Sequence, residues 1–478
     1  MNLNPFRRRK PAARKSVRSF FNGASTVARL SDFTPSYASA NVEIEADMAR
    51  LRGRARNLAN NDPLVNRWMQ LLELNVVGHV GFNLQTRARN PNGGMDKYGN
   101  DTIEKRWRKW SETATTDGQM TMRAAFQMAV RTHARDGEVL IEEVVNNKYH
   151  DSYGLRFIEA DQLDETLNED NHQGKGNVIR MGVELDQQEK PVAYHLLTSH
   201  PGDNTWFKGG RKYRRVPADR LIHLFKKERP GQVRGVPPTA PVMGSVKLLG
   251  GYRDAEITNR RIAASKMGFF TKEDEKVDGL GTIADTVDDD TGKLEMDVEP
   301  GKFTELPQGM KFDQFNPSSS GTDYADFEKQ IIRSIAAGLG VSYNSIAADL
   351  ENVSYSSIRQ GELQDRDAYR MIQKFFIERM ANRVFANWLR YAMLQADFPF
   401  PFSRYNKFLD ASTFRPRGWA WVDPSKEVSA AVKAIDANLT SMTHVVGEQG
   451  RDIEDVFEEI ESERELMKTL NIEAVATE

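Results

Sequence analysis

The fold of this chain is decided by residues 316–376, NPSSSGTDYADFEKQIIRSIAAGLGVSYNSIAADLENVSYSSIRQGELQDRDAYRMIQKFF. This stretch predicts a helix, then a polar loop punctuated by glycine, then a long helix that continues to about residue 395. Large apolar residues recur at every fourth position of the first helix and form one apolar stripe: Phe327, Ile331, Ile335 and Leu339. We expect Gly338 and Gly340 to end that helix, as glycines commonly do at a helix C-terminus.

The long second helix has the same apolar spacing: Ile372, Phe376, Met380, Val384 and Trp388. Between the two helices, residues 340–356 carry little charge and are rich in serine, asparagine and tyrosine. Serine and asparagine favour turns and caps over helix interiors. We therefore predict a polar loop joining two amphipathic helices.

Composition sets limits on the rest of the chain. With 478 residues it exceeds one ordinary hydrophobic core, so we expect two to four modules. No run approaches the roughly 20 apolar residues that cross a bilayer, so we expect no membrane association. The sequence contains no cysteine, which excludes disulfides, iron–sulfur clusters and cysteine-bound zinc.

Charge is unevenly distributed, although the net charge is only −2. Residues 1–40 are predicted to form a flexible arm whose first 18 residues contain no acid and the following bases: Arg7, Arg8, Arg9, Lys10, Arg14, Lys15 and Arg18. Such an arm can contact nucleic acid or an acidic protein surface, or it can be a solvated terminus. The solvated terminus is the interpretation that we favour.

Residues 41–242 predict an α+β module. Helices are expected over 41–77, 101–115 and 120–133, with a break at Pro63, a residue that favours the first turn of a helix. Alternating apolar residues predict strands at about 78–88, 155–159, 178–184, 192–197 and 221–225, and a further strand follows Gly137.

Two features of this module allow more than one interpretation. Trp107 and Trp110 lie among basic residues, a pattern that can stack bases, but aromatic residues at helical spacing are more often core, which we favour. The cluster Arg52, Arg54 and Arg56 can bind phosphate, but a solvated helix face is the interpretation that we favour.

The module is followed by a helix over 243–267, about 37 Å long at 1.5 Å per residue. It carries a basic series: Lys247, Arg253, Arg260, Arg261 and Lys266. Residues 268–321 form an acidic insertion with strands expected at 294–298 and 311–315. A helix on each side of an insertion predicts that the two helices pair and carry the insertion at their far end.

Residues 357–424 comprise the long helix and a following segment that is rich in proline and aromatic residues. We expect this segment to pack back on the α+β module. Residues 425–478 predict two helices separated by Gly447 and Gly450. The predicted fold class is therefore α+β and helix-rich.

Catalytic motifs are absent from the sequence. It contains no phosphate-binding P-loop and no His-Glu-x-x-His pattern, and its eight histidines are scattered. His133 and His223 lie beside apolar residues and are predicted to be buried structural groups. The adjacent acids Asp288, Asp289 and Asp290 can hold a divalent cation, but a solvated loop is the favoured interpretation. We expect no enzyme activity, no cofactor and no metal site.

Several stretches together resemble one family. They include ARLRGRARNLANNDPLVNRWMQLLELNVVG, GEVLI, GVELDQQEKPVAYHLL, IAAGLGVSYNSIAADLENVSYSSIRQG and VDPSKEVSAAVKAIDANLTSMTHVVGEQGRDIEDVFEEI. In this order they are similar to lambda-family phage portal proteins, from about Ala49 to Ile472. The chain departs from the family mainly in residues 1–40 and in the acidic insertion.

The resemblance implies a ring, usually of twelve subunits, at one vertex of a phage capsid. Double-stranded DNA is packaged through the ring by a separate terminase and later leaves through it into the tail. It implies contacts with the terminase large subunit, the major capsid protein and scaffold, and head–tail connector proteins. The expected location is the virion, and the host cytoplasm during assembly.

The resemblance also assigns parts of the chain to the family's domains. Residues 41–242 correspond to the wing, 243–267 and 322–339 to the two stem helices, 268–321 to the clip, 340–356 to the tunnel loop and 425–478 to the crown. The implied channel residues are Tyr343, Asn344, Ser345, Asn352, Ser354, Tyr355 and Ser356. The basic series of the first stem helix is expected to line the channel or to form bridges between subunits. The clip residues implied to contact the terminase or connector are Asp285, Asp288, Asp289 and Asp290.

Two other classes remain as alternatives. The first is a nucleic-acid-processing enzyme with a basic N-terminal arm, which requires converging acids or a nucleotide-binding loop. The second is a different structural subunit of a capsid or tail, which does not require two paired helices before a polar loop.

Overall fold

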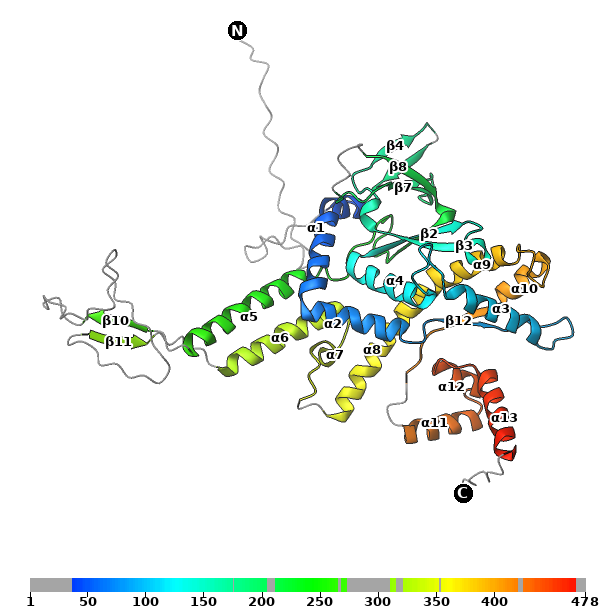
Figure 1. Ribbon diagram of the computed structural model, residues 1–478. Coiled ribbons are helices and arrows are strands. Elements are labelled where there is room, and N and C mark those ends of the chain that lie inside the picture. The colour runs from blue at the N-terminus through cyan, green and yellow to red at the C-terminus, as the bar shows by residue number, and fades with distance from the viewer. Residues whose placement is uncertain are drawn as a thin grey trace, which may run out of the picture.

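The computed structural model describes residues 37–174, 176–203, 211–264, 268–272, 310–314, 321–351, 354–419 and 424–469. An α+β module forms the body, a helical hairpin projects from it, and a C-terminal helical unit lies on another side (Figure 1). The predicted α+β, helix-rich class is confirmed. The basic residues of the N-terminal arm lie outside the described residues.

The first two helices meet at the predicted break. They are α1 (Ala40–Asn61) and α2 (Pro63–Leu72), and a π-helical turn (Glu73–Val77) extends the second. The Asp62 side chain caps α2, because its Oδ1 accepts hydrogen bonds from the backbone nitrogens of Leu64 and Val65, both at 3.0 Å. Proline in the first turn has no amide hydrogen to leave unpaired, which explains why the new helix starts there.

The core of the module is rich in aromatic residues. It lies between α3 (Lys97–Ser111), α4 (Met122–Asp136) and the later helix α9 (Asn382–Ala392). Trp107 and Trp110 are 6% and 0% exposed and pack against Trp388, so the core interpretation of these tryptophans is confirmed. The Trp110 indole also donates a hydrogen bond of 2.8 Å to the carbonyl of Tyr153.

A three-stranded antiparallel sheet adjoins this core, in the order β3 (Tyr153–Ile158), β2 (Glu138–Val145), β9 (Leu221–Phe225). Gly137 joins α4 to β2 with φ of +84°. A Cβ atom at this position would lie 2.3 Å from the carbonyl carbon of Val236, so only glycine fits. The predicted turn from helix into strand at Gly137 is confirmed.

A second sheet has five antiparallel strands in chain order: β4 (Glu169–His172), β5 (Asn177–Arg180), β6 (Val183–Leu185), β7 (Pro191–Leu197) and β8 (Tyr213–Pro217). Strands β4 and β8 were not predicted. The single strand expected over 178–184 is wrong, because Met181 and Gly182 have positive φ angles and turn the chain between β5 and β6. One face of this sheet packs in a second apolar cluster with Met48 and Leu163.

The aromatic-rich segment returns to the module, as expected. After α10 (Tyr405–Asp410), strand β12 (Ser412–Arg415) pairs antiparallel with β1 (Asn83–Thr86). This pairing joins segments more than 300 residues apart, since Leu84 lies opposite Phe414. The module therefore contains chain from both sides of the hairpin.

The projecting hairpin consists of α5 (Met243–Ala264) and α6 (Gly321–Leu339), which lie side by side, with β10 (Gly268–Lys272) and β11 (Met310–Gln314) at the far end (Figure 1). The predicted pairing of two helices around an insertion is confirmed, and so is a strand near 311–315. Strand β10 was not predicted, and 294–298 lies outside the described residues. Gly338 does not end α6 but lies within it, where a Cβ would lie 2.4 Å from Val242. Gly340 ends the helix, with φ of +71°.

The predicted loop and long helix differ in detail from the expectation. A short helix, α7 (Tyr343–Ala347), lies within 340–356, and α8 (Tyr355–Phe376) begins within the predicted loop because Ser354 caps it. A π-helical turn (Ile377–Ala381) connects α8 to α9. The C-terminal unit has three described helices, not two: α11 (Pro424–Asp436), α12 (Met442–Glu448) and α13 (Ile453–Thr469). Gly447 lies inside α12, because Ser441 caps an additional helix there.

Candidate functional site: the projecting hairpin and the 340–356 segment

Helices α5 and α6 are held together by an ion pair and by aromatic contacts. Arg253 Nε lies 2.6 Å from Glu328 Oε1 across the hairpin. Tyr252 stacks on Tyr324 with ring centroids 5.4 Å apart, and it meets Phe327 edge to face. These contacts fix the two helices against each other along the described part of the hairpin.

The basic series of α5 therefore divides into two kinds of residue. Arg253 pairs with the other helix, and Arg260 pairs with Glu256 one turn earlier, at 2.8 Å. Lys247 and Arg261 are exposed on the surface of α5. Lys266 lies outside the described residues.

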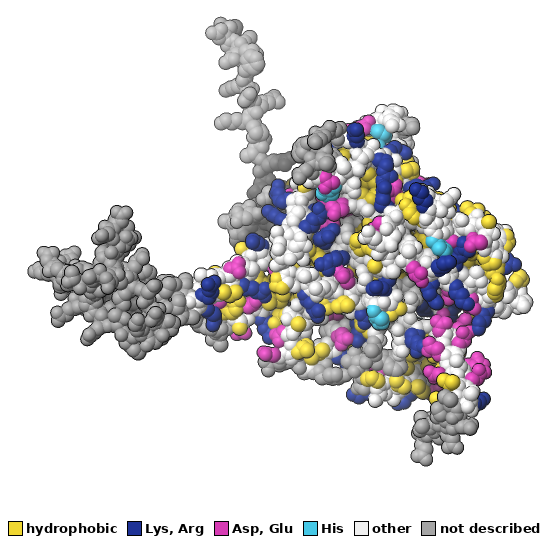
Figure 2. All heavy atoms as spheres, viewed as in Figure 1, with side chains coloured by type: hydrophobic (Ala, Val, Ile, Leu, Met, Phe, Trp, Pro, Cys, Tyr) yellow, Lys and Arg dark blue, Asp and Glu magenta, His cyan; other side chains and the backbone are white. Residues whose placement is uncertain are grey.

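Several apolar side chains of the hairpin are turned toward solvent (Figure 2). Leu248 is 76% exposed, Ile257 57% and Phe327 52%. Phe327 belongs to the predicted apolar stripe, whose other end is buried, since Ile335 is 0% and Leu339 8% exposed. The stripe is therefore buried only where α6 enters the module.

The 340–356 segment is fixed to α8 by one carboxylate. Asp365 accepts hydrogen bonds from the backbone nitrogen and the hydroxyl of Ser342, both at 2.8 Å, and from the Ser345 hydroxyl at 2.7 Å. Asp365 is 5% exposed. Because Ser342 is also the N-cap of α7, this carboxylate positions the start of the short helix.

The other end of α7 is tied back to α6. The Tyr343 hydroxyl donates a 2.8 Å hydrogen bond to Asp349, which also lies 3.1 Å from Lys329 Nζ. Lys329 and Arg333 lie over the Tyr343 ring, 5.4 and 5.5 Å from its centroid. Desolvation and the hydrogen bond to Asp349 raise the pKa of Tyr343 to about 12, so this ring is neutral at physiological pH.

The residues implied to line a channel thus have different surroundings. Tyr343, Asn344 and Ser345 are half-buried, and the first and last of these make the contacts above. Ser354 and Ser356 are exposed at the start of α8, as are Leu350 and Glu351. The side chains of Asn352 and Tyr355 lie outside the described residues, as do the clip residues Asp285, Asp288, Asp289 and Asp290.

The arginine cluster of α1 is neither a phosphate site nor a wholly solvated face. Arg52 is 2% exposed and binds Glu138 at 3.1 Å and Asp161 at 2.9 Å. Arg56 binds Asp136 and Asp161, while Arg54 is exposed on the same helix. Both interpretations of the cluster are wrong for Arg52, because acids distant in sequence converge on it.

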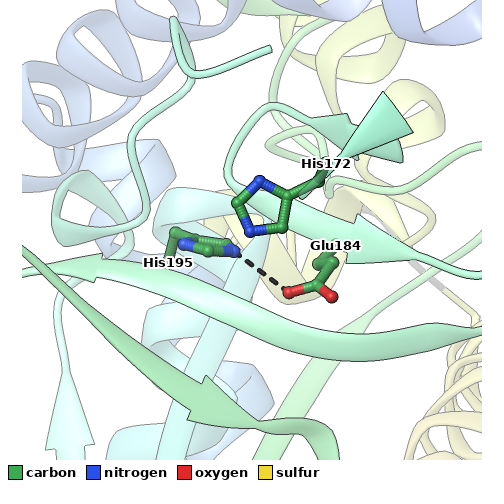
Figure 3. A group of neighbouring side chains, drawn as sticks. All are labelled: His172, Glu184 and His195. Carbon is green, nitrogen blue, oxygen red and sulfur yellow. Dashed lines mark hydrogen bonds and ion pairs between the residues drawn. The ribbon is translucent and has the colours of Figure 1, made fainter. Parts of the chain in front are cut away.

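Sequence reasoning also missed a cluster of side chains on the five-stranded sheet. His172, Glu184 and His195 come from three different strands, and their side chains turn toward one another (Figure 3). Ligand atoms of the three lie within 4.8 Å of one another. No motif spacing reveals this group, because the sheet register brings its members together. His223 is buried, as predicted, whereas His133 is half-buried, with only its Nε2 atom known to be enclosed.

The comparisons with known proteins agree with this architecture. The family model for phage portal proteins of the lambda family matches residues 26–373, most of the chain. The chain belongs to the lambda family of phage portal proteins. It is thus a portal protein, a head–tail connector of a phage particle, and the family is structural rather than enzymatic.

Two phage relatives support the same assignment. The chain is 35% identical over 431 residues to the probable portal protein of Halomonas phage phiHAP-1, covering 90% of this chain and 82% of that protein. It is 22% identical over 475 residues to portal protein B of Escherichia phage lambda, covering 91% and 87%. A chain from the neck of an empty GTA particle is similar at 12% identity and a TM-score of 0.46, covering 87% of this chain and 95% of that one.

Membership in this family implies a multi-subunit ring in a phage capsid. Within the described part of the chain, no helix has the length and apolar character that crossing a bilayer requires. The alternative of a nucleic-acid-processing enzyme receives no support from these comparisons.

Proposed function

We propose that about twelve copies of this portal protein form a closed ring around a channel for double-stranded DNA, with α5 and α6 as its stem. The α+β module is the wing, residues 268–321 are the clip and the C-terminal helices are the crown. The observation that carries this proposal is the exposed apolar surface of the hairpin. Leu248, Ile257 and Phe327 are exposed in the single chain, and a neighbouring hairpin in a ring would cover them.

The 340–356 segment is the part of the chain that we propose narrows the channel. DNA must slide past it, and each lysine or arginine that binds a phosphate would oppose sliding. None of the exposed residues Leu350, Glu351, Ser354 and Ser356 is a lysine or arginine. Asp365 and Asp349 bind the side chains at the start of the segment. The exposed residues that follow are therefore held in a fixed position relative to α6 and α8.

The stem carries a second, weaker set of candidates for the channel wall. Arg253 and Arg260 are already paired with acids, so their charge is partly neutralised. Lys247 and Arg261 are exposed, and they line the channel or bridge to acids of a neighbouring subunit.

The partners follow from this role. The terminase large subunit delivers DNA at the clip, whose acids Asp285, Asp288, Asp289 and Asp290 complement a basic surface. Head–tail connector proteins bind after packaging, and the major capsid protein and scaffold surround the ring. Assembly takes place in the host cytoplasm. The ring itself acts as a conduit, without catalysis.

The position of the 340–356 segment can be tested with single cysteines, because the natural chain has none. Ser354→Cys places a thiol on the exposed tip, and Asp170→Cys places a matched control on the module, where Asp170 has a side-chain exposure of 84%. Procapsids carrying either variant are labelled with a bulky maleimide and supplied with terminase, ATP and DNA.

Nuclease-protected DNA is then measured before and after labelling. We expect the label at residue 354 to reduce protected DNA at least tenfold and the label at 170 to leave it unchanged. Equal packaging by the two labelled variants would contradict the placement of this segment in the channel.

A further inference from the structure

The five-stranded sheet has one apolar face and one polar face. Residues alternate between the faces along β6 and β7, so Val183, Leu185, Tyr194 and Leu196 enter the apolar cluster. The opposite face carries Glu184 and His195, which are only 3% and 8% exposed. A carboxylate and an imidazole buried on a sheet face require specific partners.

The histidine of the edge strand β4 completes this group. His172 Nδ1 lies 2.7 Å from Glu169 Oε2, and a carboxylate can only accept there, so Nδ1 carries the hydrogen. The other ring nitrogen, Nε2, is then a bare acceptor. It is buried and has no hydrogen-bond partner among the described residues. Figure 3 shows the ring directed toward His195 and Glu184.

We infer that His172, Glu184 and His195 form a binding site for a divalent transition-metal ion, with Zn²⁺ as the best fit. Two imidazole nitrogens and one carboxylate oxygen are a ligand set that zinc accepts with water in the fourth position. Glu169 orients His172 in the way that carboxylates commonly orient metal-bound histidines.

His195 Nε2 lies 3.2 Å from Glu184 Oε2 and donates its hydrogen to that carboxylate, so a metal ion at Nε2 requires the hydrogen to move to Nδ1. Apart from this change of tautomer, the geometry requires the ligand atoms to move closer together. At bond lengths of 2.0–2.1 Å, tetrahedral zinc ligands lie about 3.4 Å apart, and the three ligand atoms here lie within 4.8 Å of one another. The movement can come from β4, which is the edge strand and pairs with β5 through an irregular register. A bound ion would therefore fix the edge of the sheet to its centre.

Arg215 on β8 is the competitor for this site. Its guanidinium binds Glu184 through Nε at 2.8 Å and through a second nitrogen at 3.1 Å, and Asn177 also donates to the same carboxylate. A metal ion must share the carboxylate with this cation. The proposal therefore makes an unusual prediction, that removing Arg215 tightens metal binding.

A second cluster, Glu159, Asp161 and His200, has similar spacing. Its Asp161 already binds Arg52 and Arg56, and His200 Nε2 lies 2.9 Å from Glu159. In this cluster, His200 does not have the arrangement of His172, in which one ring nitrogen binds a carboxylate and the other is left as an acceptor without a partner. This cluster serves as the control site.

The test is calorimetric titration of ZnCl₂ into the full-length, chelator-treated protein. We expect one ion per chain. Binding should weaken at least tenfold in His172→Ala and in His195→Ala, weaken about tenfold in Glu169→Gln, and tighten in Arg215→Ala. It should be unchanged in His200→Ala and in His444→Ala, a variant of an exposed histidine.

Cobalt substitution gives a second readout that does not depend on stability. Visible absorption of tetrahedral Co²⁺ should appear in the natural protein and disappear in His172→Ala, whose residue lies on the edge strand β4. Absence of zinc binding, or zinc binding that survives His172→Ala and is lost in His200→Ala, would overturn the proposal.

Discussion

Arg234 and Glu138 form an ion pair in which neither side chain is exposed to solvent. The Arg234 guanidinium binds both carboxylate oxygens, at 2.5–3.1 Å, and also donates to the carbonyls of Leu163 and Met181. Arg52 of α1 binds the same carboxylate. This one glutamate therefore joins α1, β2 and the segment that leads into the hairpin.

Glu138→Gln should destabilise the module strongly. The substitution removes the acid that pairs with buried Arg234 and leaves Arg52 with only Asp161 and Glu165. Removing one partner of a buried ion pair costs about 3–5 kcal/mol. Chemical denaturation measures the loss in free energy of unfolding. The control is Asp170→Asn, which removes an exposed pair with Arg180 and should cost less than about 1 kcal/mol. Similar losses in the two variants would show that the buried network is not important for stability.

His133 should make stability depend on pH between about 4 and 6.5. Burial lowers its pKa to about 4, and its ring packs against Phe375 and Phe376. The unfolded chain binds a proton on this residue at higher pH than the folded chain does. Stability is therefore present above pH 6.5 and is lost as pH falls toward 4, by about 3 kcal/mol at 1.36 kcal/mol per pKa unit.

The check is the melting temperature of His133→Leu against pH. This variant should lose less stability than the natural protein as pH falls from 6.5 to 4, because its side chain has no proton to gain. His444→Gln, which changes an exposed histidine, should behave as the natural protein does. Parallel curves for all three proteins would mean that His133 is not the titrating group.

Glu104 should make stability depend on pH in the sense opposite to His133, because its ionised form is the one that burial disfavours. Burial, with the neighbouring carboxylates of Asp455 and Asp452, raises its pKa to about 7, despite the hydrogen bond that it accepts from Thr86. Acidic side chains gather where α13 faces this part of the module (Figure 2). Because the folded pKa is raised, ionised Glu104 costs stability above pH 7, and this cost disappears as pH falls toward 4.5.

Glu104→Gln mimics the protonated form, so it should stabilise the protein at pH 8 by about 1–2 kcal/mol, after allowing for partial solvent screening. At pH 5 its effect should be small. Denaturation at the two pH values measures the difference. An equal effect at both pH values would indicate a change in packing, unrelated to ionisation.

Asp365→Ala should loosen the 340–356 segment and leave the rest of the chain folded. It removes three hydrogen bonds to Ser342 and Ser345, so amides of residues 342–351 should exchange faster by at least tenfold. Asp367→Ala is the matched control, because Asp367 lies two residues away and has a side-chain exposure of 74%. Unchanged exchange in Asp365→Ala would show that another contact holds the segment.

The elements that the sequence predicted well are those with a strong local signal. The stripe from Phe327 to Leu339 predicted α6, and Pro63 marked the start of α2, because helical periodicity and caps are local properties. Strand β8 and the turn at Met181 were missed because short strands depend on their neighbours in the sheet. The loop was predicted to extend to residue 356, but α8 begins at Tyr355 because Ser354 caps it. Composition alone does not reveal which serine acts as the cap.

The site was less predictable than the fold. Polar composition identified 340–356 as a special segment, but its fixation by Asp365 and Asp349 depends on contacts between elements. The pairing of Arg52 with Glu138, and the meeting of His172 with His195, have the same origin. Groups brought together by tertiary structure have no fixed spacing in the sequence, so no motif predicts them.

The central claim, a ring with a channel, is tested most directly by mass measurement and single-particle imaging of the purified full-length protein. The account predicts particles of about twelve subunits with a central opening wide enough for duplex DNA, in which Leu248, Ile257 and Phe327 are covered by neighbouring hairpins. A compact monomer or dimer at every salt concentration tested would contradict it.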